Sequence, residues 1–316
     1  MPDPVLALDG LRVRFGPTEA VRGVDLDVHK GETHCLVGES GCGKSVTALA
    51  IMGLLARGAV RDAGRIRFQG NDISALSDRA LGKLRGDRIG MIFQEPMTSL
   101  NPAYTVGSQM TEVFRRHRGG PRADATARAE TLLGRVGIAA PGQRLGQFPH
   151  QLSGGLRQRV MIAMALMCGP ELLIADEPTT ALDVTVQAGI LRLLAGLQAE
   201  MGLALLLITH DLGVVARVAH RVSVMYAGQV VESAPATDLF ARPTHPYTRG
   251  LLASVPVPSR VRRDQPLGSI PGTVPRITTG FQGCGFRDRC PQARPICAQD
   301  IPWKQPTPTH QVRCVL

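Results

Sequence analysis

Between a compact strand-like run and a predicted helix, the chain carries the segment Gly38-Glu39-Ser40-Gly41-Cys42-Gly43-Lys44-Ser45. The run Thr33–Val37 before it is typical of a buried strand, and Val46–Leu55 after it is typical of a helix. The segment fits the pattern G-x-x-x-x-G-K-[ST], in which small residues let backbone N–H groups converge on phosphate oxygens at a helix start. The sequence therefore predicts a phosphate-binding loop, with Lys44 on the β- and γ-phosphates of a nucleotide and Ser45 on Mg²⁺.

The segment has a plainer interpretation as a glycine-rich turn that binds nothing. Lys44 is one of only four lysines in a chain that contains 32 arginines, so a lysine at this position is unexpected by chance. With this composition, a match to the whole pattern anywhere in the chain has a probability of roughly half a percent. We therefore favour a nucleotide-binding site.

A second pattern places acidic side chains at the end of a buried strand. The apolar run Leu172–Ala175 is followed directly by Asp176 and Glu177, and Asp176 comes 132 residues after Lys44. The carboxyl ends of parallel strands are where an open α/β sheet binds its ligands. Many strands end in acidic residues. Combined with the phosphate-binding segment, however, this one predicts Asp176 as a Mg²⁺ ligand through water and Glu177 as the group that activates the attacking water.

The order of predicted elements indicates an α/β fold with a parallel sheet, because strands alternate with crossover helices. Strands are predicted at Val24–Val28, Ile66–Phe68, Ile89–Phe93, Leu172–Ala175, Leu203–Thr209 and Val222–Tyr226. Helices are predicted at Asp124–Val136, Arg157–Met167 and Val184–Glu200. The helical stretch near residues 97–168 is typical of an insertion between strands. After about Arg242 the chain is rich in proline and lacks periodicity, so we expect a main domain over residues 1–242 and an extension over residues 243–316.

The composition excludes several other classes of protein. Among 316 residues, 44% are hydrophobic, which is enough for a sizeable core, and aromatics at 4% argue against stacked platforms for nucleic acids. No apolar run reaches the roughly 18 residues needed to cross a bilayer. Residues 1–10 lack the basic start and apolar core of a secretory signal, so we expect a cytosolic protein with reduced thiols.

Further motifs lie before, between and after the phosphate-binding segment and the acidic strand end. In chain order they are Phe15, Gln94 after the strand predicted at 89–93, Leu152-Ser153-Gly154-Gly155, the run Thr180–Asp183, and His210 after the strand predicted at 203–209. This order resembles that of the ATP-binding cassette (ABC) ATPases over about residues 5–240. The resemblance implies a P-loop NTPase fold with an antiparallel β subdomain and an inserted helical subdomain near residues 97–168.

In that family two subunits close head to tail on two ATP molecules, and hydrolysis reopens them. The resemblance implies that the Ser153–Gly155 turn faces the γ-phosphate of ATP bound to the partner subunit. It implies that Gln94 contributes to the Mg²⁺ site and that His210 holds the γ-phosphate and the attacking water. Phe15 is expected to stack on adenine, with a place in the core as the alternative. Leu156 is a departure, because the family usually carries glutamine at this position.

The end of the chain requires its own explanation. Four of the seven cysteines lie within the last 33 residues: Cys284, Cys290, Cys297 and Cys314. Disulfides are disfavoured in a cytosolic protein, and metal binding is a better interpretation than unrelated free thiols. The close Cys-x₂₋₄-Cys pair of most zinc sites is missing, so we favour a [4Fe–4S] cluster over zinc. The charge of four thiolates would be compensated by adjacent arginines: Arg287, Arg289, Arg294 and Arg313.

The run His245-Pro246-Tyr247-Thr248, followed by the cysteine-rich tail, is similar to the C-terminal extension of peptide-importer ATPases. The runs Glu95–Pro102 and Arg159–Ala165 also resemble that subfamily, and more specifically its D-type subunit, which pairs with a distinct F-type ATPase. The resemblance implies a peripheral subunit on the cytoplasmic face of the bacterial inner membrane. It implies that the helical region contacts two permeases and that an extracytoplasmic binding protein delivers the substrate, with nickel or another small solute as the alternative to peptides.

The basic balance of the chain leaves one competing function. The formal net charge is +10, which suits a soluble ABC-type ATPase that acts on nucleic acid or ribosomes. Such proteins usually carry two cassettes or long coiled coils, whereas this chain carries one cassette and no heptad run. We therefore expect an importer subunit without a nucleic-acid partner.

Overall fold

The computed structural model describes residues 3–94, 99–180, 182–255 and 268–316. Part of the run Glu95–Pro102 and one residue of the run Thr180–Asp183 therefore lie outside the described residues. The chain divides into two compact units. The first consists of residues 1–28, 32–74 and 208–316, and the second of residues 29–31 and 75–207. The predicted C-terminal extension thus belongs to the first unit, and the predicted helical insertion belongs to the second.

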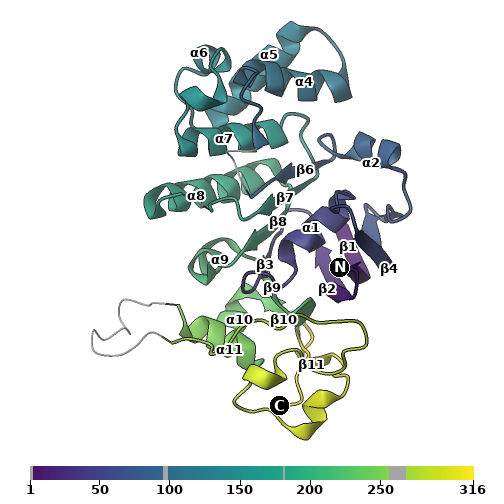
Figure 1. The fold of residues 1–316 in the computed structure, drawn as a ribbon. Helices are drawn as coiled ribbons and strands as arrows, with labels where there is room; N and C mark the ends of the chain where they lie inside the picture. Colours follow the sequence, from purple (N-terminus) through teal and green to yellow (C-terminus); the bar gives the residue numbers. More distant parts are fainter. Residues whose placement is uncertain (1–2, 95–98, 181, 256–267) are drawn as a thin grey trace. The chain divides into compact units, whose positions relative to one another are not determined.

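An antiparallel sheet in the order β2-β1-β4-β5 begins the first unit (Figure 1). Its strands are β1 (Leu6–Phe15), β2 (Thr18–Val28), β4 (Ala59–Phe68) and β5 (Asn71–Asp72). At the end of β2, Val24, Leu26 and Val28 are buried, whereas Asp25 and Asp27 are exposed. One face of the sheet therefore covers the core and the other faces solvent, as the alternating sequence predicts.

A second run of strands in the first unit has the order β11-β12-β10-β9-β3. Its strands are β3 (Thr33–Val37), β9 (Arg221–Tyr226), β10 (Gln229–Pro235), β11 (Lys304–Thr307) and β12 (His310–Val312). β3 and β9 are parallel, whereas β10 pairs antiparallel with β9 and with β12. Every residue of β3 is buried, which is typical of a parallel strand covered on both faces. The phosphate-binding segment therefore follows a fully buried strand.

The helices of the first unit are α1 (Lys44–Met52), α9 (Leu212–Val218), α10 (Ala236–Ala241) and α11 (Pro246–Ala253). Two 3₁₀ turns follow at Arg287–Arg289 and Pro295–Ala298. α11 begins at a proline, and Nδ1 of His245 accepts a hydrogen bond from the N–H of Tyr247 at 3.1 Å. The described part of the chain after Arg242 therefore contains a capped helix and short 3₁₀ turns, which its proline-rich composition does not indicate.

The second unit combines parallel strands with a helical region. β6 (Ile89–Ile92) pairs parallel with β7 (Leu172–Asp176), and β8 (Ala204–Thr209) lies beside β7. The helices are α2 (Asp78–Leu84), α4 (Val106–Arg118), α5 (Arg122–Arg135), α6 (Pro141–Leu145), α7 (Gly154–Ala165) and α8 (Val184–Met201), with a 3₁₀ turn at Pro149–Gln151. α4, α5 and α6 pack together in the predicted helical insertion (Figure 1). In the described ranges, none of the helices is long and apolar enough to span a bilayer.

Candidate active site

The segment Gly38–Ser45 forms a tight loop between β3 and α1. Gly43 has a φ of 108°, which favours glycine, and a Cβ at this position would collide with the carbonyl oxygen of Ala20. A Cβ on Gly38 would collide with the carbonyl oxygen of Met225. Glycines are therefore required where the loop passes directly against neighbouring backbone. The loop ends at the start of α1, where unpaired N–H groups and the helix dipole favour an anion.

Lys44 is buried in the loop, with 4% of its surface exposed. Its Nζ donates hydrogen bonds to the carbonyl oxygens of Gly38 at 2.8 Å and Glu39 at 3.0 Å. Ser45, the next residue, is half-buried in the first turn of α1. Burial raises the pKa of the Cys42 thiol, so this side chain stays neutral. The ammonium group of Lys44 is therefore held in place by carbonyl groups of the loop. The N–H groups of the same loop are the ones expected to bind a phosphate.

Two residues of the C-terminal extension contact the loop at Glu39. Arg289 donates two hydrogen bonds to the Glu39 carboxylate, from Nη1 to Oε2 at 2.7 Å and from Nη2 to Oε1 at 3.0 Å. The backbone N–H of Glu39 donates to Oη of Tyr247 at 2.9 Å. Neither contact was predicted from the sequence. The available signal was a carboxylate inside a phosphate-binding loop, because such a charge requires a nearby cation.

A pocket of about 390 Å³ opens beside the loop. Phe15 lines it together with Ser40 and Gly41 of the loop and with residues 274–277 of the extension. The backbone N–H of Glu19 donates to the carbonyl oxygen of residue 277 at 2.8 Å, which fixes the extension at the pocket wall. Phe15 is half-buried, so the structure places this ring in a pocket wall and not in the closed core.

His210 follows β8 directly and is exposed. The next residue, Asp211, caps α9 by accepting hydrogen bonds from the N–H groups of Gly213 at 2.8 Å and Val214 at 3.3 Å. This cap fixes the point at which the chain turns from the strand into the helix. His210 is thereby held at the carboxyl end of its strand, which is where the sequence places it.

In the second unit, the acidic strand end is held by side-chain hydrogen bonds. β7 is buried throughout and ends at Asp176, of which 4% is exposed. Oε2 of Glu177 accepts hydrogen bonds from Nε2 of Gln94 at 3.3 Å and from Oγ1 of Thr180 at 2.9 Å. The parallel register explains the contact with Gln94, because Ile92 pairs with residue 175. Gln94 and Glu177 each lie two residues further along the chain from this pair. The structure thus brings Gln94 and Glu177 together.

The Ser153–Gly155 turn lies at the start of α7. The Ser153 side chain caps this helix by accepting a hydrogen bond from the N–H of Leu156 at 3.4 Å. Ser153 and Gly154 are exposed, and a Cβ on Gly155 would approach Cγ1 of Val186 to 3.1 Å. Leu156 contributes only its backbone to the cap. The departure from the family pattern at this position therefore leaves the exposed turn intact.

The four C-terminal cysteines lie in one region of the structure. Burial and the neighbouring thiols of Cys297, Cys314 and Cys290 raise the pKa of Cys284 to about 11. All four are free thiols. Among the described residues, no group of three or more His, Cys, Asp or Glu side chains is placed to hold a metal ion. The structure therefore gives no support to the predicted [4Fe–4S] cluster or to its zinc alternative.

Three of the four arginines beside these cysteines pair with carboxylates. Arg289 pairs with Glu39, Arg313 lies 3.3 Å from a carboxylate oxygen of Asp25, and Arg287 lies 3.6 Å from Asp288. The charges of these three arginines are therefore compensated by carboxylates, whereas the sequence analysis expected them to compensate thiolates.

The chain combines a glycine-rich loop, which carries a buried lysine at the start of a helix, with a buried apolar strand that ends in an acidic residue. This combination is typical of the P-loop class of nucleotide-binding proteins. A family profile described as "ABC transporter" matches residues 21–180. A second, described as "Oligopeptide/dipeptide transporter, C-terminal region", matches residues 231–297.

Comparison with individual proteins agrees with these two family matches. The probable peptide ABC transporter ATP-binding protein y4tR of Sinorhizobium fredii is 52% identical over 299 residues, which is 94% of this chain and 89% of the relative. The dipeptide transport ATP-binding protein DppD of Bacillus subtilis is 49% identical over 324 residues, covering 99% of this chain and 95% of the relative. The ATP-binding cassette MJ0796, solved as a dimer in a post-hydrolysis state with ADP and Pi, has a TM-score of 0.64 at 29% identity and covers 73% of this chain and 98% of that one. The chain therefore belongs to the ATP-binding proteins of ABC transporters, in the group with the oligopeptide/dipeptide C-terminal region.

Proposed function

We propose that this chain is the ATP-binding and ATP-hydrolysing subunit of an importer that takes up peptides. The carrying observation is the combination, in one chain, of a phosphate-binding loop containing a buried lysine and a region typical of oligopeptide/dipeptide transporters. That region favours a peptide importer over a nickel importer and over a soluble ATPase acting on nucleic acid or ribosomes. The relatives from Sinorhizobium fredii and Bacillus subtilis, which are peptide and dipeptide transport proteins by name, support the same choice.

In this proposal the first unit binds the nucleotide. Lys44 and the N–H groups of the loop hold the β- and γ-phosphates, and Ser45 offers its hydroxyl to Mg²⁺. Phe15 stacks on adenine in the pocket that it lines. His210 contacts the γ-phosphate and orients the attacking water. Mg²⁺, when bound, neutralises charge that develops on the phosphate oxygens.

The second unit supplies the groups for hydrolysis. Glu177 takes the proton of the attacking water, and the hydrogen bonds from Gln94 and Thr180 orient its carboxylate. Asp176 and Gln94 offer side-chain oxygens to Mg²⁺. The chemistry therefore requires little beyond positioned carboxylates, which agrees with a reaction dominated by orientation and electrostatics.

The exposed Ser153–Gly155 turn is proposed to act on a second ATPase subunit. At a helix start it suits a phosphate group, and its exposure leaves it available to ATP held by the partner. The dimeric structure of MJ0796 supports such pairing. We further propose that the partner is a distinct F-type ATPase, and that both contact two permeases at the cytoplasmic face of the membrane. An extracytoplasmic binding protein would deliver the peptide.

Peptide-dependent hydrolysis tests this function. The chain is purified with its permeases and partner ATPase in lipid nanodiscs, and phosphate release is measured with the binding protein carrying alanyl-alanine. We expect hydrolysis to rise on addition of the loaded binding protein and to vanish in Lys44→Ala. If only a nickel-loaded binding protein stimulated ATP hydrolysis, the substrate would be reassigned to nickel. Stimulation of hydrolysis by RNA in the absence of the permeases would favour a soluble ATPase acting on nucleic acid.

The iron–sulfur cluster stays a separate prediction, carried by four cysteines within 31 positions. Metal analysis of anaerobically purified protein tests it. About four irons per chain are expected for a [4Fe–4S] cluster. Stoichiometric zinc without iron, or neither metal, would contradict it.

A further inference from the structure

Glu39 is an unfavourable residue for a phosphate-binding loop. Its carboxylate lies on the loop whose neighbouring backbone N–H groups would face a triphosphate, and like charges at short range repel. The side chain is partly buried, with 30% exposed, so solvent screens its charge only in part. A loop that contains this carboxylate therefore binds phosphate well only if the charge is neutralised.

Arg289 supplies the neutralising charge from the C-terminal extension. Its two-pronged contact with Glu39, at 2.7 and 3.0 Å, is the strongest geometry available to an arginine and a carboxylate. Only 7% of the Arg289 side chain is exposed. The guanidinium also donates to the carbonyl oxygens of Pro271 at 2.7 Å and Ile270 at 3.0 Å and to Oη of Tyr226 at 3.2 Å. Arg289 is therefore fixed in orientation, and Glu39 with it.

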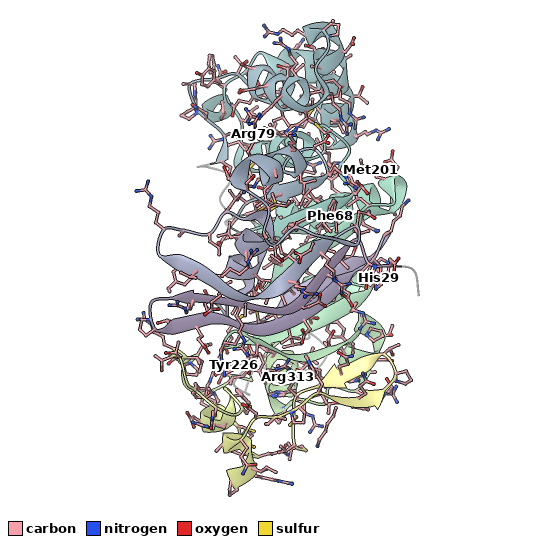
Figure 2. All side chains as sticks on the ribbon, turned by 90° about the vertical axis from the view of Figure 1, so that its right-hand side faces the viewer. His29, Phe68, Arg79, Met201, Tyr226 and Arg313 are labelled. Atoms are coloured by element: carbon pink, nitrogen blue, oxygen red, sulfur yellow. The ribbon has the colours of Figure 1, made fainter. Side chains whose placement is uncertain are left out.

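An aromatic cluster holds the backbone on the other side of Glu39. Oη of Tyr247 accepts the Glu39 N–H, and the Tyr247 ring lies 4.5 Å from that of Tyr226 and 5.3 Å from that of Phe286. The ring centroid of Tyr226, a residue labelled in Figure 2, lies 5.2 Å from that of Phe286 in the extension. Both the side chain and the backbone of Glu39 are thus anchored to residues outside the loop.

We propose that Arg289 is a positioning residue for ATP: by neutralising and fixing Glu39, it lets the C-terminal extension set the affinity of the phosphate-binding loop. The inference rests on the proposed nucleotide-binding function of the loop. It assigns to the extension a role within its own subunit. Removal of Arg289 leaves a carboxylate beside the phosphates, so the loss of affinity grows with the number of phosphates on the nucleotide.

Titration of the full chain with fluorescent mant-ATP, mant-ADP and mant-AMP tests the proposal. For Arg289→Ala we expect ATP to bind about tenfold to a hundredfold more weakly, ADP to be less affected, and AMP to be nearly unchanged. The double variant Glu39→Gln/Arg289→Ala should recover most of the ATP affinity, because the repelling charge is absent. Arg287→Ala, in the same 3₁₀ turn and paired with an exposed Asp288, is the matched control and should bind all three as the wild type does.

The single variant Glu39→Gln keeps the test decisive if Arg289→Ala does not fold. It retains the shape of the side chain, and the proposal expects it to bind ATP at least as tightly as the wild type. Circular dichroism and thermal unfolding check each variant. Unchanged ATP binding in Arg289→Ala, or an equal loss for all three nucleotides without recovery in the double variant, would overturn the proposal. Absence of nucleotide binding by the wild-type chain would instead contradict the proposed function itself.

Discussion

The phosphate-binding loop and the acidic strand end hold their charged side chains in different ways. Glu39 in the loop is contacted by Tyr247 and Arg289, which follow it by 208 and 250 residues. Glu177 is contacted by Thr180, three residues later, and by Gln94, which lies two residues beyond the end of the adjacent parallel strand β6. The loop thus depends on the C-terminal extension, whereas the strand end is assembled within its own unit. Nucleotide affinity and hydrolysis rate should therefore respond to different mutations.

The backbone at the strand end sharpens this difference. Glu177 has a φ of 44°, a left-handed conformation that costs a non-glycine residue roughly 1–2 kcal/mol. Strain of this kind persists where the surrounding structure fixes the residue, and it concentrates at functional sites. In the loop, by contrast, Gly41 and Gly43 adopt the left-handed conformations, which costs little. The strand end therefore places strain on Glu177, the residue proposed to activate water, and the loop does not place strain on a non-glycine residue.

The largest expected effect is on hydrolysis. Glu177→Gln removes the proton acceptor but keeps the shape of the side chain, so the rate of ATP hydrolysis should fall about 10²- to 10⁴-fold. ATP affinity should stay within about threefold of the wild type, because the loop is unchanged. Phosphate release and mant-ATP titration measure the two quantities.

Glu171→Gln is the matched control for this variant. Glu171 is also in the second unit, but it pairs with Arg88 at the other end of β7 and is 40% exposed. It should leave both rate and affinity unchanged. If Glu177→Gln weakened ATP binding as much as it slowed hydrolysis, the separation between the two regions would not hold.

A smaller effect is expected from filling the space at a loop glycine. In Gly43→Ala the added methyl would collide with the carbonyl oxygen of Ala20 and lie 2.8 Å from Cε of Met225. Because backbone must move, we expect a loss of about 3 kcal/mol in the free energy of unfolding. Urea denaturation followed by circular dichroism measures it.

Gly10→Ala separates collision from conformational strain. Gly10 also has a positive φ, of 61°, but no atom lies within 4 Å of an added Cβ. It should cost only about 1 kcal/mol. If Gly43→Ala and Gly10→Ala lost equal amounts of unfolding free energy, the close contact between the loop and β2 would not control the stability of the protein.

Local patterns in the sequence were sufficient to predict most of the cassette. The strand Thr33–Val37 is found with its predicted bounds, because a fully buried parallel strand leaves a short apolar run. The sequence also placed Gln94 and Glu177 directly after predicted strands, and the structure shows that these two strands are parallel neighbours. These features depend on residues close in sequence or on a regular register, which is why the chain alone reveals them.

The extension was less predictable for the opposite reason. β12 (His310–Val312) pairs with β10 across about 80 residues, and its three residues give no periodic signal. Arg289 was interpreted through the cysteine beside it, whereas its partner is the distant Glu39. Polar contacts between distant segments leave no local pattern, so only the unusual charge of the loop pointed to them.

The smallest expected effect concerns the pocket beside the loop. Phe15→Ala removes the ring from the wall of this pocket, which residues 274–277 complete. Loss of stacking on a base should weaken nucleotide binding about fivefold to a hundredfold. Because adenine is common to them, ATP, ADP and AMP should be weakened to the same degree, and competition titrations with mant-ATP measure the three.

This uniform loss distinguishes the pocket from the contact between Arg289 and Glu39, whose effect should grow with phosphate number. Tyr104→Ala, at a ring that is 56% exposed in the second unit, controls for loss of an aromatic side chain and should change nothing. If Phe15→Ala weakened ATP but not AMP, the ring would act on the phosphate-binding loop and not on the base. The extension would then influence only the phosphate end of the nucleotide, since the pocket that it completes would have no part in recognising adenine.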